Sequence, residues 1–179
     1  MEFAEITTLT NWVIDPEHSA IGFRVKHLVV SNVRGKFKEY TARIFTEGDD
    51  FKTAEIDVRI NAASIDTGTE KRDEHLRSAD FFDVQQFKEI SFTGKLTGEK
   101  DLFLTGQLTI KGITKQVTLN VEFGSTKDPW GTIKALFGIS GKINRREWGL
   151  NYNSVLETGG VLVSEDVWIE CEIQLVKKV

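Results

Sequence analysis

The amino-acid sequence predicts an all-β fold of about eight antiparallel strands with one short helical insertion. Three observations lead to this prediction: apolar and polar residues alternate along most of the chain, turn-forming residues separate the alternating runs, and only residues 69–77 form a segment rich in helix formers. A sheet of this size removes its exposed edges by curling into a barrel. We therefore expect a single antiparallel barrel.

The predicted strands follow one another along the chain. In residues 19–28, Ile21, Phe23 and Val25 share one face, while Arg24 and Lys26 lie on the other. The same alternation occurs in residues 54–60, 89–96, 101–110, 117–123, 131–143 and 166–175. The alternation changes parity within residues 35–45, and a β-bulge near residues 38–39 would restore the register.

Turns and one helix complete the predicted elements. Residues 97–100 join two strands, and Lys111-Gly112 reads as a tight hairpin turn. The helix is expected over Thr69 to Arg77, and Asp80 is expected to cap a short second turn in the stretch DFFDV.

Length, composition and charge exclude several classes of protein. The chain has 179 residues, 40% of them hydrophobic, which suits one domain with a sizeable core. A net charge of -4 gives no sign of a nucleic-acid-binding protein, and a single cysteine excludes an internal disulfide. No stretch approaches the ~20 apolar residues of a membrane helix. The N-terminus lacks signal-peptide features, so we expect a cytoplasmic protein, or a periplasmic one if a signal has been removed.

The inward-facing residues are nearly all aliphatic or aromatic, which fits a filled core and an apolar cavity equally well. Four glycines of inward parity would leave room for a ligand, or would permit the bends that close a barrel: Gly94, Gly106, Gly131 and Gly141. Both alternatives stay open. If there is a cavity, its expected wall comprises Phe23, Val25, Phe37, Ile56, Val58, Phe92, Leu108, Phe137 and Ile169.

The sequence does not assemble a catalytic or metal site. The three histidines, His18, His27 and His75, share no ligand spacing, and Cys171 reads as a core residue. No set of nucleophile, base and orienting group can be put together, so we expect no catalytic residue, no metal and no cofactor. The stretch Asn144 to Gly149, NRREWG, reads either as a surface loop or as a site for a phosphate or carboxylate.

Several motifs occur in an order that identifies a family resemblance. These are WVIDPEHSAIGFRVKHL, SIDTGTEKRDEHLRSADFFDV, LTGQLTIKGITKQVTL and INRREWGLNYN. The chain resembles the YceI-like family of polyisoprenoid-binding proteins from Trp12 to Leu175, although Phe87-Lys88 stands where the family usually has Tyr-Pro. The resemblance implies residues 1–11 as an N-terminal extension and 12–179 as one extended, lipocalin-like barrel domain.

The resemblance also implies a non-catalytic function, the binding or carrying of a long-chain apolar ligand such as an isoprenoid quinone, a polyprenyl phosphate or another fatty lipid. Phe81 and Phe82 are then expected near the open end. Arg72 and His75 either bond the helix to the rim, with Arg72 held by a carboxylate such as Asp73 or Asp83, or meet the ligand's polar head. The alternative function is a stress-linked adaptor or carbohydrate-binding module that acts through its surface. Whether the protein forms a homodimer stays open.

Overall fold

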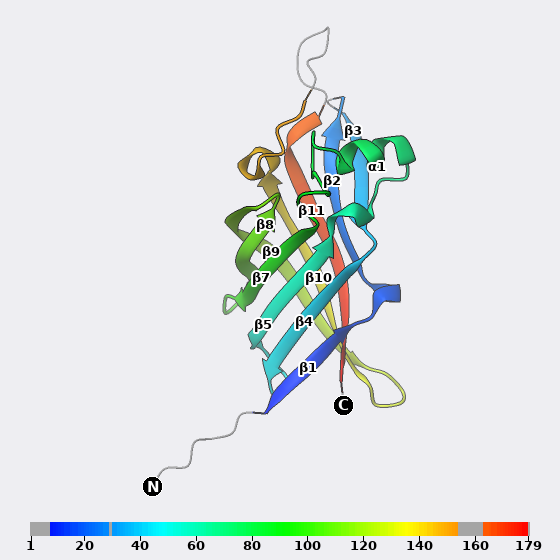
Figure 1. Ribbon diagram of the computed structural model, residues 1–179. Helices are drawn as coiled ribbons and strands as arrows, with labels where there is room; N and C mark the ends of the chain where they lie inside the picture. Colours follow the sequence, from blue (N-terminus) through cyan, green and yellow to red (C-terminus); the bar gives the residue numbers. More distant parts are fainter. Residues whose placement is uncertain (1–7, 29, 154–162, 179) are drawn as a thin grey trace.

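The computed structural model describes residues 8–28, 30–153 and 163–178, and these form a closed antiparallel barrel (Figure 1). The strands are β1 (Leu9–Ile14), β2 (Ala20–His27), β3 (Ser31–Phe37), β4 (Tyr40–Glu47), β5 (Asp50–Asn61), β6 (Ile65–Asp66), β7 (Glu89–Thr97), β8 (Leu102–Ile110), β9 (Ile113–Lys127), β10 (Ile133–Asn144) and β11 (Val163–Lys177). The helix α1 (Glu70–Arg77) follows β6. None of the helices in the described ranges is long and apolar enough to cross a bilayer.

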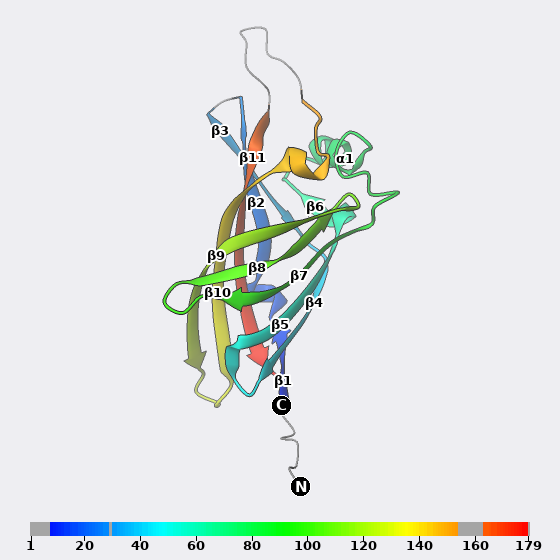
Figure 2. The same ribbon diagram turned by 90° about the vertical axis from the view of Figure 1, so that its left-hand side faces the viewer.

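Eight strands close the barrel, as the sequence predicts. The ring runs β1-β4-β5-β7-β8-β9-β10-β11 and is closed by pairing of β1 with β11, in which Trp12 lies opposite Lys177. The long strand β11 also pairs with β2 through residues 163–172, so β2, β3 and β6 extend the wall beyond β1 and β4 (Figure 2). Every strand pair in this sheet is antiparallel.

Two breaks in the wall have local causes. Between β1 and β2, the carboxylate of Asp15 accepts a hydrogen bond from the Glu17 backbone N–H at 3.1 Å and caps the 3-10 turn Pro16–His18. Between β3 and β4, the backbone N–H groups of Lys38 and Glu39 donate to the carbonyl and hydroxyl oxygens of Ser64. The sequence expectation of a β-bulge near residues 38–39 is therefore corrected: the change of parity there marks the boundary between β3 and β4, which pair with different neighbours.

Three sequence expectations need adjustment. Gly131 lies before β10, in a turn with φ +89°, and not on an inward strand face. Asp80 caps no second helical turn: residues 79–84 form irregular turns, and its carboxylate is 2.8 Å from His75 Nε2. Strand β1 begins at Leu9, so it includes residues 9–11 of the expected extension, whereas residues 1–7 lie outside the described residues.

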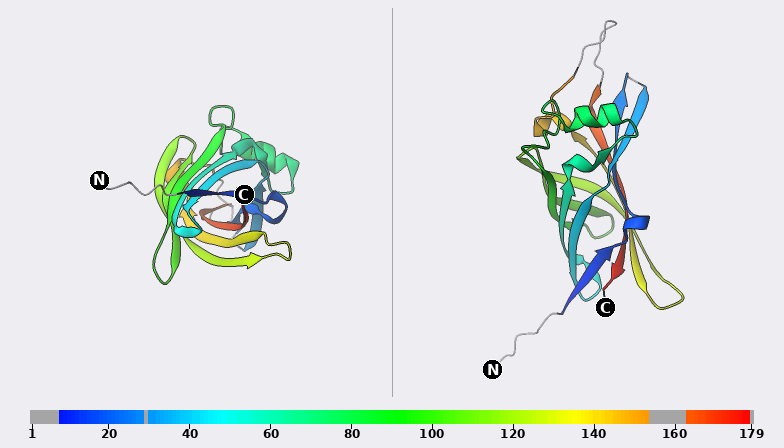
Figure 3. Two further views of the ribbon diagram at one scale, coloured as in Figure 1. Left: turned by 90° about the horizontal axis from the view of Figure 1, so that it is seen from below. Right: turned by 45° about the vertical axis from the view of Figure 1, so that its right-hand side comes forward.

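The two ends of the barrel differ. At the end where β1 starts, the buried Trp12 donates from Nε1 to Thr46 Oγ1 at 2.9 Å, and its ring lies 4.7 Å from that of Phe51. Phe51 in turn packs on Phe137 at 5.2 Å, so aromatic rings close this end. The helix α1 lies at the opposite end (Figure 3).

Candidate functional site

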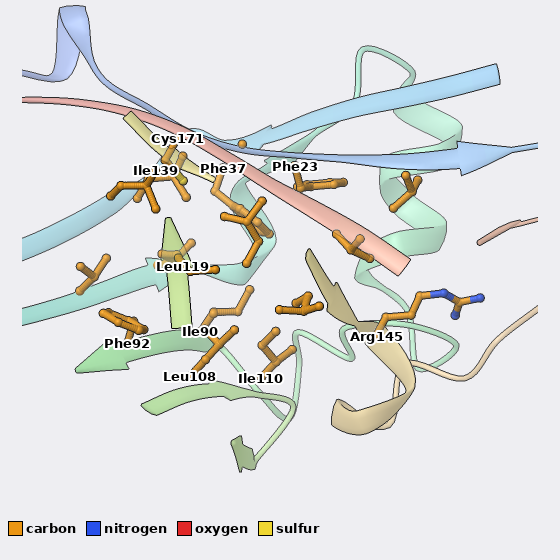
Figure 4. Close-up of a pocket in the computed structure, with 18 of the residues that line it drawn as sticks. Phe23, Phe37, Ile90, Phe92, Leu108, Ile110, Leu119, Ile139, Arg145 and Cys171 are labelled. Carbon is orange, nitrogen blue, oxygen red and sulfur yellow. The ribbon is translucent and has the colours of Figure 1, made fainter. Parts of the chain in front are cut away.

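An apolar cavity of about 790 Å³ lies inside the barrel. Aliphatic and aromatic side chains from nearly every strand face it, and Figure 4 shows this wall with Phe92, Leu108, Leu119 and Ile139 pointing inward. The volume falls within the range typical of ligand pockets. Of the two alternatives for the barrel interior, a cavity is therefore present.

Every predicted ligand-binding residue lies on the wall of this cavity. The strands contribute Phe23, Val25, Phe37, Ile56, Val58, Phe92, Leu108, Phe137 and Ile169, and the α1 end contributes Arg72, His75, Phe81 and Phe82. Their contact with a ligand stays a prediction. The strand residues could be predicted from their odd or even position along each strand, because side chains alternate between the two faces of a strand.

The cavity opens at the α1 end. Three of the residues that line it there, Thr69, Lys71 and Tyr152, are exposed to solvent. At the other end, the lining residues Phe137 and Leu175 are buried. We call the α1 end, formed by residues 67–82, Arg145 and Tyr152, the mouth.

The inward glycines of β7 and β8 do not leave room for a ligand, which was one of the two alternatives that the sequence left open for them. A Cβ at Gly94 would lie 2.6 Å from the Thr105 carbonyl oxygen, and one at Gly106 would clash with that of Thr93. The ring of Phe92 lies over both glycines, 2.6 and 2.7 Å from those Cβ positions. Because Gly94 and Gly106 have no side chain, β7 and β8 can lie close together, and the ring of Phe92 can cover both glycines.

Arg72 is held by a threonine and not by the expected carboxylate. Its Nε donates to Thr67 Oγ1 at 2.7 Å, and its Nη2 donates to the Thr67 carbonyl oxygen at 2.6 Å. The buried Asp73 accepts instead from the Thr67 backbone N–H and hydroxyl, at 2.9 and 2.6 Å. Within the described ranges, no ion pair neutralises Arg72.

His75 links the two sides of the mouth. Its ring stands edge-on to Phe81 at 5.2 Å and to Tyr152 at 4.8 Å, and Phe81 lies 5.2 Å from Tyr152. The segment after α1 is therefore packed against the segment after β10 by aromatic contacts.

Arg145 belongs to the stretch NRREWG, for which the sequence left open a surface loop or a site for a phosphate or carboxylate, and it is the residue of that stretch that reaches the cavity. It is only 4% exposed, lines the mouth, and donates to backbone carbonyl oxygens of Leu150, Tyr152, Val163 and Ser164. Burial lowers the pKa of its guanidinium, although an arginine remains charged. In the stretch NRREWG, Arg145 and Trp148 are buried, with Trp148 donating to the Leu108 carbonyl oxygen at 2.9 Å, whereas Arg146 and Glu147 are exposed. The stretch is therefore a surface turn with two buried anchors, and its binding of a phosphate or carboxylate stays a prediction.

The charge of the lining is one-sided. Its cationic side chains are Lys71, Arg72 and Arg145, all at the mouth, and no aspartate or glutamate is among the lining residues of the described chain. No ion pair involves Lys71 or Arg145 within the same ranges. The described residues also bring no group of three or more His, Cys, Asp or Glu together. The site is therefore an apolar chamber in which the charged side chains that line the cavity are cations at the mouth.

Cys171 lies on the cavity wall, opposite Ile139 of β10 and Ile21 of β2. Burial among apolar neighbours raises the pKa of its thiol to about 11. The thiol is thus protonated at neutral pH and behaves as a small apolar group.

These features define a class of protein, the antiparallel β-barrel that encloses an elongated apolar cavity. The model of the YceI-like domain matches residues 12–175, and the chain belongs to this family. A UPF0312 protein of Staphylococcus aureus strain USA300 is 40% identical over 168 residues, covering 93% of this chain and 97% of the relative. The family resemblance seen in the sequence is confirmed.

Solved structures agree with the fold. The crystal structure of a Campylobacter jejuni YceI protein is 30% identical, with a TM-score of 0.74 over 100% of both chains. A polyisoprenoid binding domain from Saccharophagus degradans, implicated in plant cell wall breakdown, is 14% identical, with a TM-score of 0.66 over 93% of this chain and 98% of that one.

Proposed function

We propose that the protein binds the hydrocarbon chain of a long amphiphile, such as an isoprenoid quinone, a polyprenyl phosphate or a fatty lipid, without chemically changing it. The observation that carries the proposal is the combination of a deep apolar cavity with cationic side chains that line its open end, where no acidic side chain of the described residues lines it. The description of the Saccharophagus degradans barrel as polyisoprenoid-binding supports the same class of ligand.

Burial of the chain would supply most of the affinity. Each methylene removed from water contributes about 0.8 kcal/mol, which corresponds to roughly a fourfold gain in affinity. A dozen methylenes give about 10 kcal/mol before the cost of association is subtracted. Affinity should therefore rise with chain length until the chain fills the cavity and then stop rising.

The mouth would select the polar head. Arg72 is fixed by Thr67 through Nε and Nη2, its Nη1 bonds none of the described residues, and Lys71 lines the same opening. Charge-assisted hydrogen bonds are roughly twice as strong as neutral ones, so an anionic head gains more here than a quinone. Arg72→Ala should accordingly weaken a polyprenyl phosphate more than a quinone of the same chain length, and Arg59→Ala, on the outside of the barrel, should affect neither.

A chain-length series tests the proposal. Binding of saturated fatty acids of increasing length would be measured by displacement of a fluorescent fatty acid, for the native chain and for the double variant Ile139→Trp/Cys171→Phe. Both positions face the middle of the cavity from paired strands. The expected result is that the variant's affinity levels off at a shorter chain, with short chains bound normally.

Val13→Trp is the matched control, since Val13 is 46% exposed on β1 and not part of the cavity wall. It should leave the whole series unchanged. If the filled variant bound every chain length as the native protein does, the ligand would lie outside the cavity. That outcome would favour the alternative of a module that acts through its outer surface.

A further inference from the structure

We propose that the outer face of the β2–β3 hairpin docks the mouth of the barrel onto an anionic membrane surface. Residues 20–38 contain five cationic side chains and no aspartate or glutamate, in a chain that has 23 cationic and 27 acidic residues. The five are Arg24, Lys26, Arg34, Lys36 and Lys38. If charged residues were spread evenly along the chain, residues 20–38 would also contain acidic ones. This hairpin is therefore basic, whereas the chain as a whole is acidic.

The strand register places these cations together on the outside. Arg24 pairs with Arg34, and Gly22 pairs with Lys36, while Val25 and Val33 of the alternate register face the cavity. Like charges directly opposite one another destabilise a sheet. Arg24 is compensated by Glu170 at 3.0 Å and stacks on the ring of Trp168 at 4.5 Å, so Arg34 is the member of the pair whose charge is left over on the outer face.

Part of this charge is neutralised by neighbours, and part is left over. Arg24 donates to Glu170 at 3.0 Å, and Lys38 lies 3.6 Å from Asp66. Lys26, Arg34 and Lys36 are exposed, and none of them forms an ion pair within the described residues. Lys36 lies directly opposite Asp66 of β6, so the charge left over is mainly that of Lys26 and Arg34. Of the four acidic side chains of the adjacent strand β11, Asp166 pairs with Lys142, Glu165 with Arg146 and Glu170 with Arg24. The fourth, Glu172, lies opposite Ala20 at the far end of β2 and forms no ion pair within the described residues.

The tip of the same hairpin is apolar. Leu28 is 46% exposed and Val30 is 79% exposed. The hairpin points to the same end of the barrel as α1 and the mouth (Figure 3). Basic residues beside exposed apolar ones are the combination that binds a membrane interface, because the cations meet anionic head groups while the apolar side chains enter the boundary. A nucleic acid would be bound by the basic side chains alone and would leave the exposed apolar tip without a role.

The inference goes beyond the proposed function and can fail separately from it, since vesicle binding does not require an occupied cavity. Flotation of the protein with phosphatidylcholine vesicles, with and without added phosphatidylglycerol, tests it. We expect binding to the anionic vesicles, little to the neutral ones, and a loss of binding as salt rises from about 0.1 M to about 0.5 M.

The decisive variant is Lys26→Gln/Arg34→Gln/Lys36→Gln. Each cation near an anionic surface contributes roughly a fivefold gain in affinity, so three should cost on the order of a hundredfold. The matched control is Lys52→Gln/Lys95→Gln/Lys100→Gln, which removes the same charge from exposed positions on β5, β7 and the turn after β7. Unchanged thermal melts of both variants would show that folding is not the cause.

A second variant tests the apolar tip. Leu28 has a positive φ of 53°, a conformation that asparagine tolerates, so Leu28→Asn/Val30→Ser removes the apolar contact without straining the turn. This variant should bind the vesicles more weakly, and the binding that remains should be lost completely at high salt because it is purely electrostatic. Three results would overturn the proposal: no binding by the native protein, equal losses in the basic and control triple variants, or tighter binding to a short DNA duplex than to the vesicles.

Discussion

Alkylation of Cys171 offers a direct test of how the cavity wall is built. This thiol is the single cysteine of the chain and faces the cavity midway along β11. Apolar burial raises its pKa to about 11, from an ordinary value of 9.0. Because the thiolate is the reactive form, the folded environment should suppress its reaction with iodoacetamide.

The size of the effect follows from the two pKa values. At about pH 8 a thiol with a pKa of 9.0 is roughly one-tenth ionised, whereas one with a pKa of about 11 is roughly one-thousandth ionised. The folded protein should therefore react about a hundredfold more slowly than the same chain in urea. The rate should continue to rise about tenfold per pH unit to about pH 11.

Mass spectrometry of timed samples measures the alkylated fraction, and Cys171→Ala provides the background. Addition of a long-chain fatty acid should slow the native reaction further, because the chain would cover the thiol. A native rate at about pH 8 that matches the unfolded chain, or a rate that levels off near pH 9, would refute the argument that this side chain faces an apolar and water-poor wall.

Three further predictions concern stability. Between about pH 9 and about pH 11 the thiol of Cys171 keeps its proton in the folded state and has lost it in the unfolded state. The free energy of unfolding should therefore fall with rising pH, by at most about 3 kcal/mol. Urea titrations of Cys171→Ala should not show this fall. Gly106→Ala should cost about 3 kcal/mol, because the new Cβ meets strand β7, whereas Gly124→Ala, whose Cβ meets nothing within 4 Å, should change the urea midpoint little; equal midpoints would contradict this packing. In the same assay, Arg145→Met should lower the free energy of unfolding by about 3 kcal/mol, because it leaves buried carbonyl oxygens without a donor. Arg146→Met, at an exposed position, should lower it by about 1 kcal/mol or less. A small loss in both variants would show that the fold does not need Arg145.

The sequence predicted the barrel and its inner wall because alternation depends on local geometry alone. Side chains of Phe92 and Ile169 must face the same side as their neighbours two residues away, whatever the rest of the chain does. The change of parity at residues 38–39 showed that the pattern is interrupted there, but it did not show that the interruption is a boundary between two strands and not a β-bulge.

Features that depend on contacts between distant segments were not predictable in this way. The clash at Gly106 comes from Thr93 on the neighbouring strand, which no local pattern reveals. Arg145 lies in a 3-10 turn where the period of two does not apply, and its burial depends on carbonyl groups up to 19 residues away. The partner of Arg72 was likewise not predictable: a carboxylate such as Asp73 was expected to hold it, but Asp73 accepts a hydrogen bond from Thr67, and Thr67 holds Arg72.

The most direct test of the central claim is the lipid content of the protein purified without detergent. Organic extraction and mass spectrometry would be applied to the native chain, to Ile139→Trp/Cys171→Phe and to Val13→Trp. If the cavity holds the chain of an amphiphile, the native protein and Val13→Trp should yield a long-chain lipid in stoichiometric amount, and the filled variant should yield much less or only shorter chains. The same lipid in the same amount from all three proteins would contradict the account.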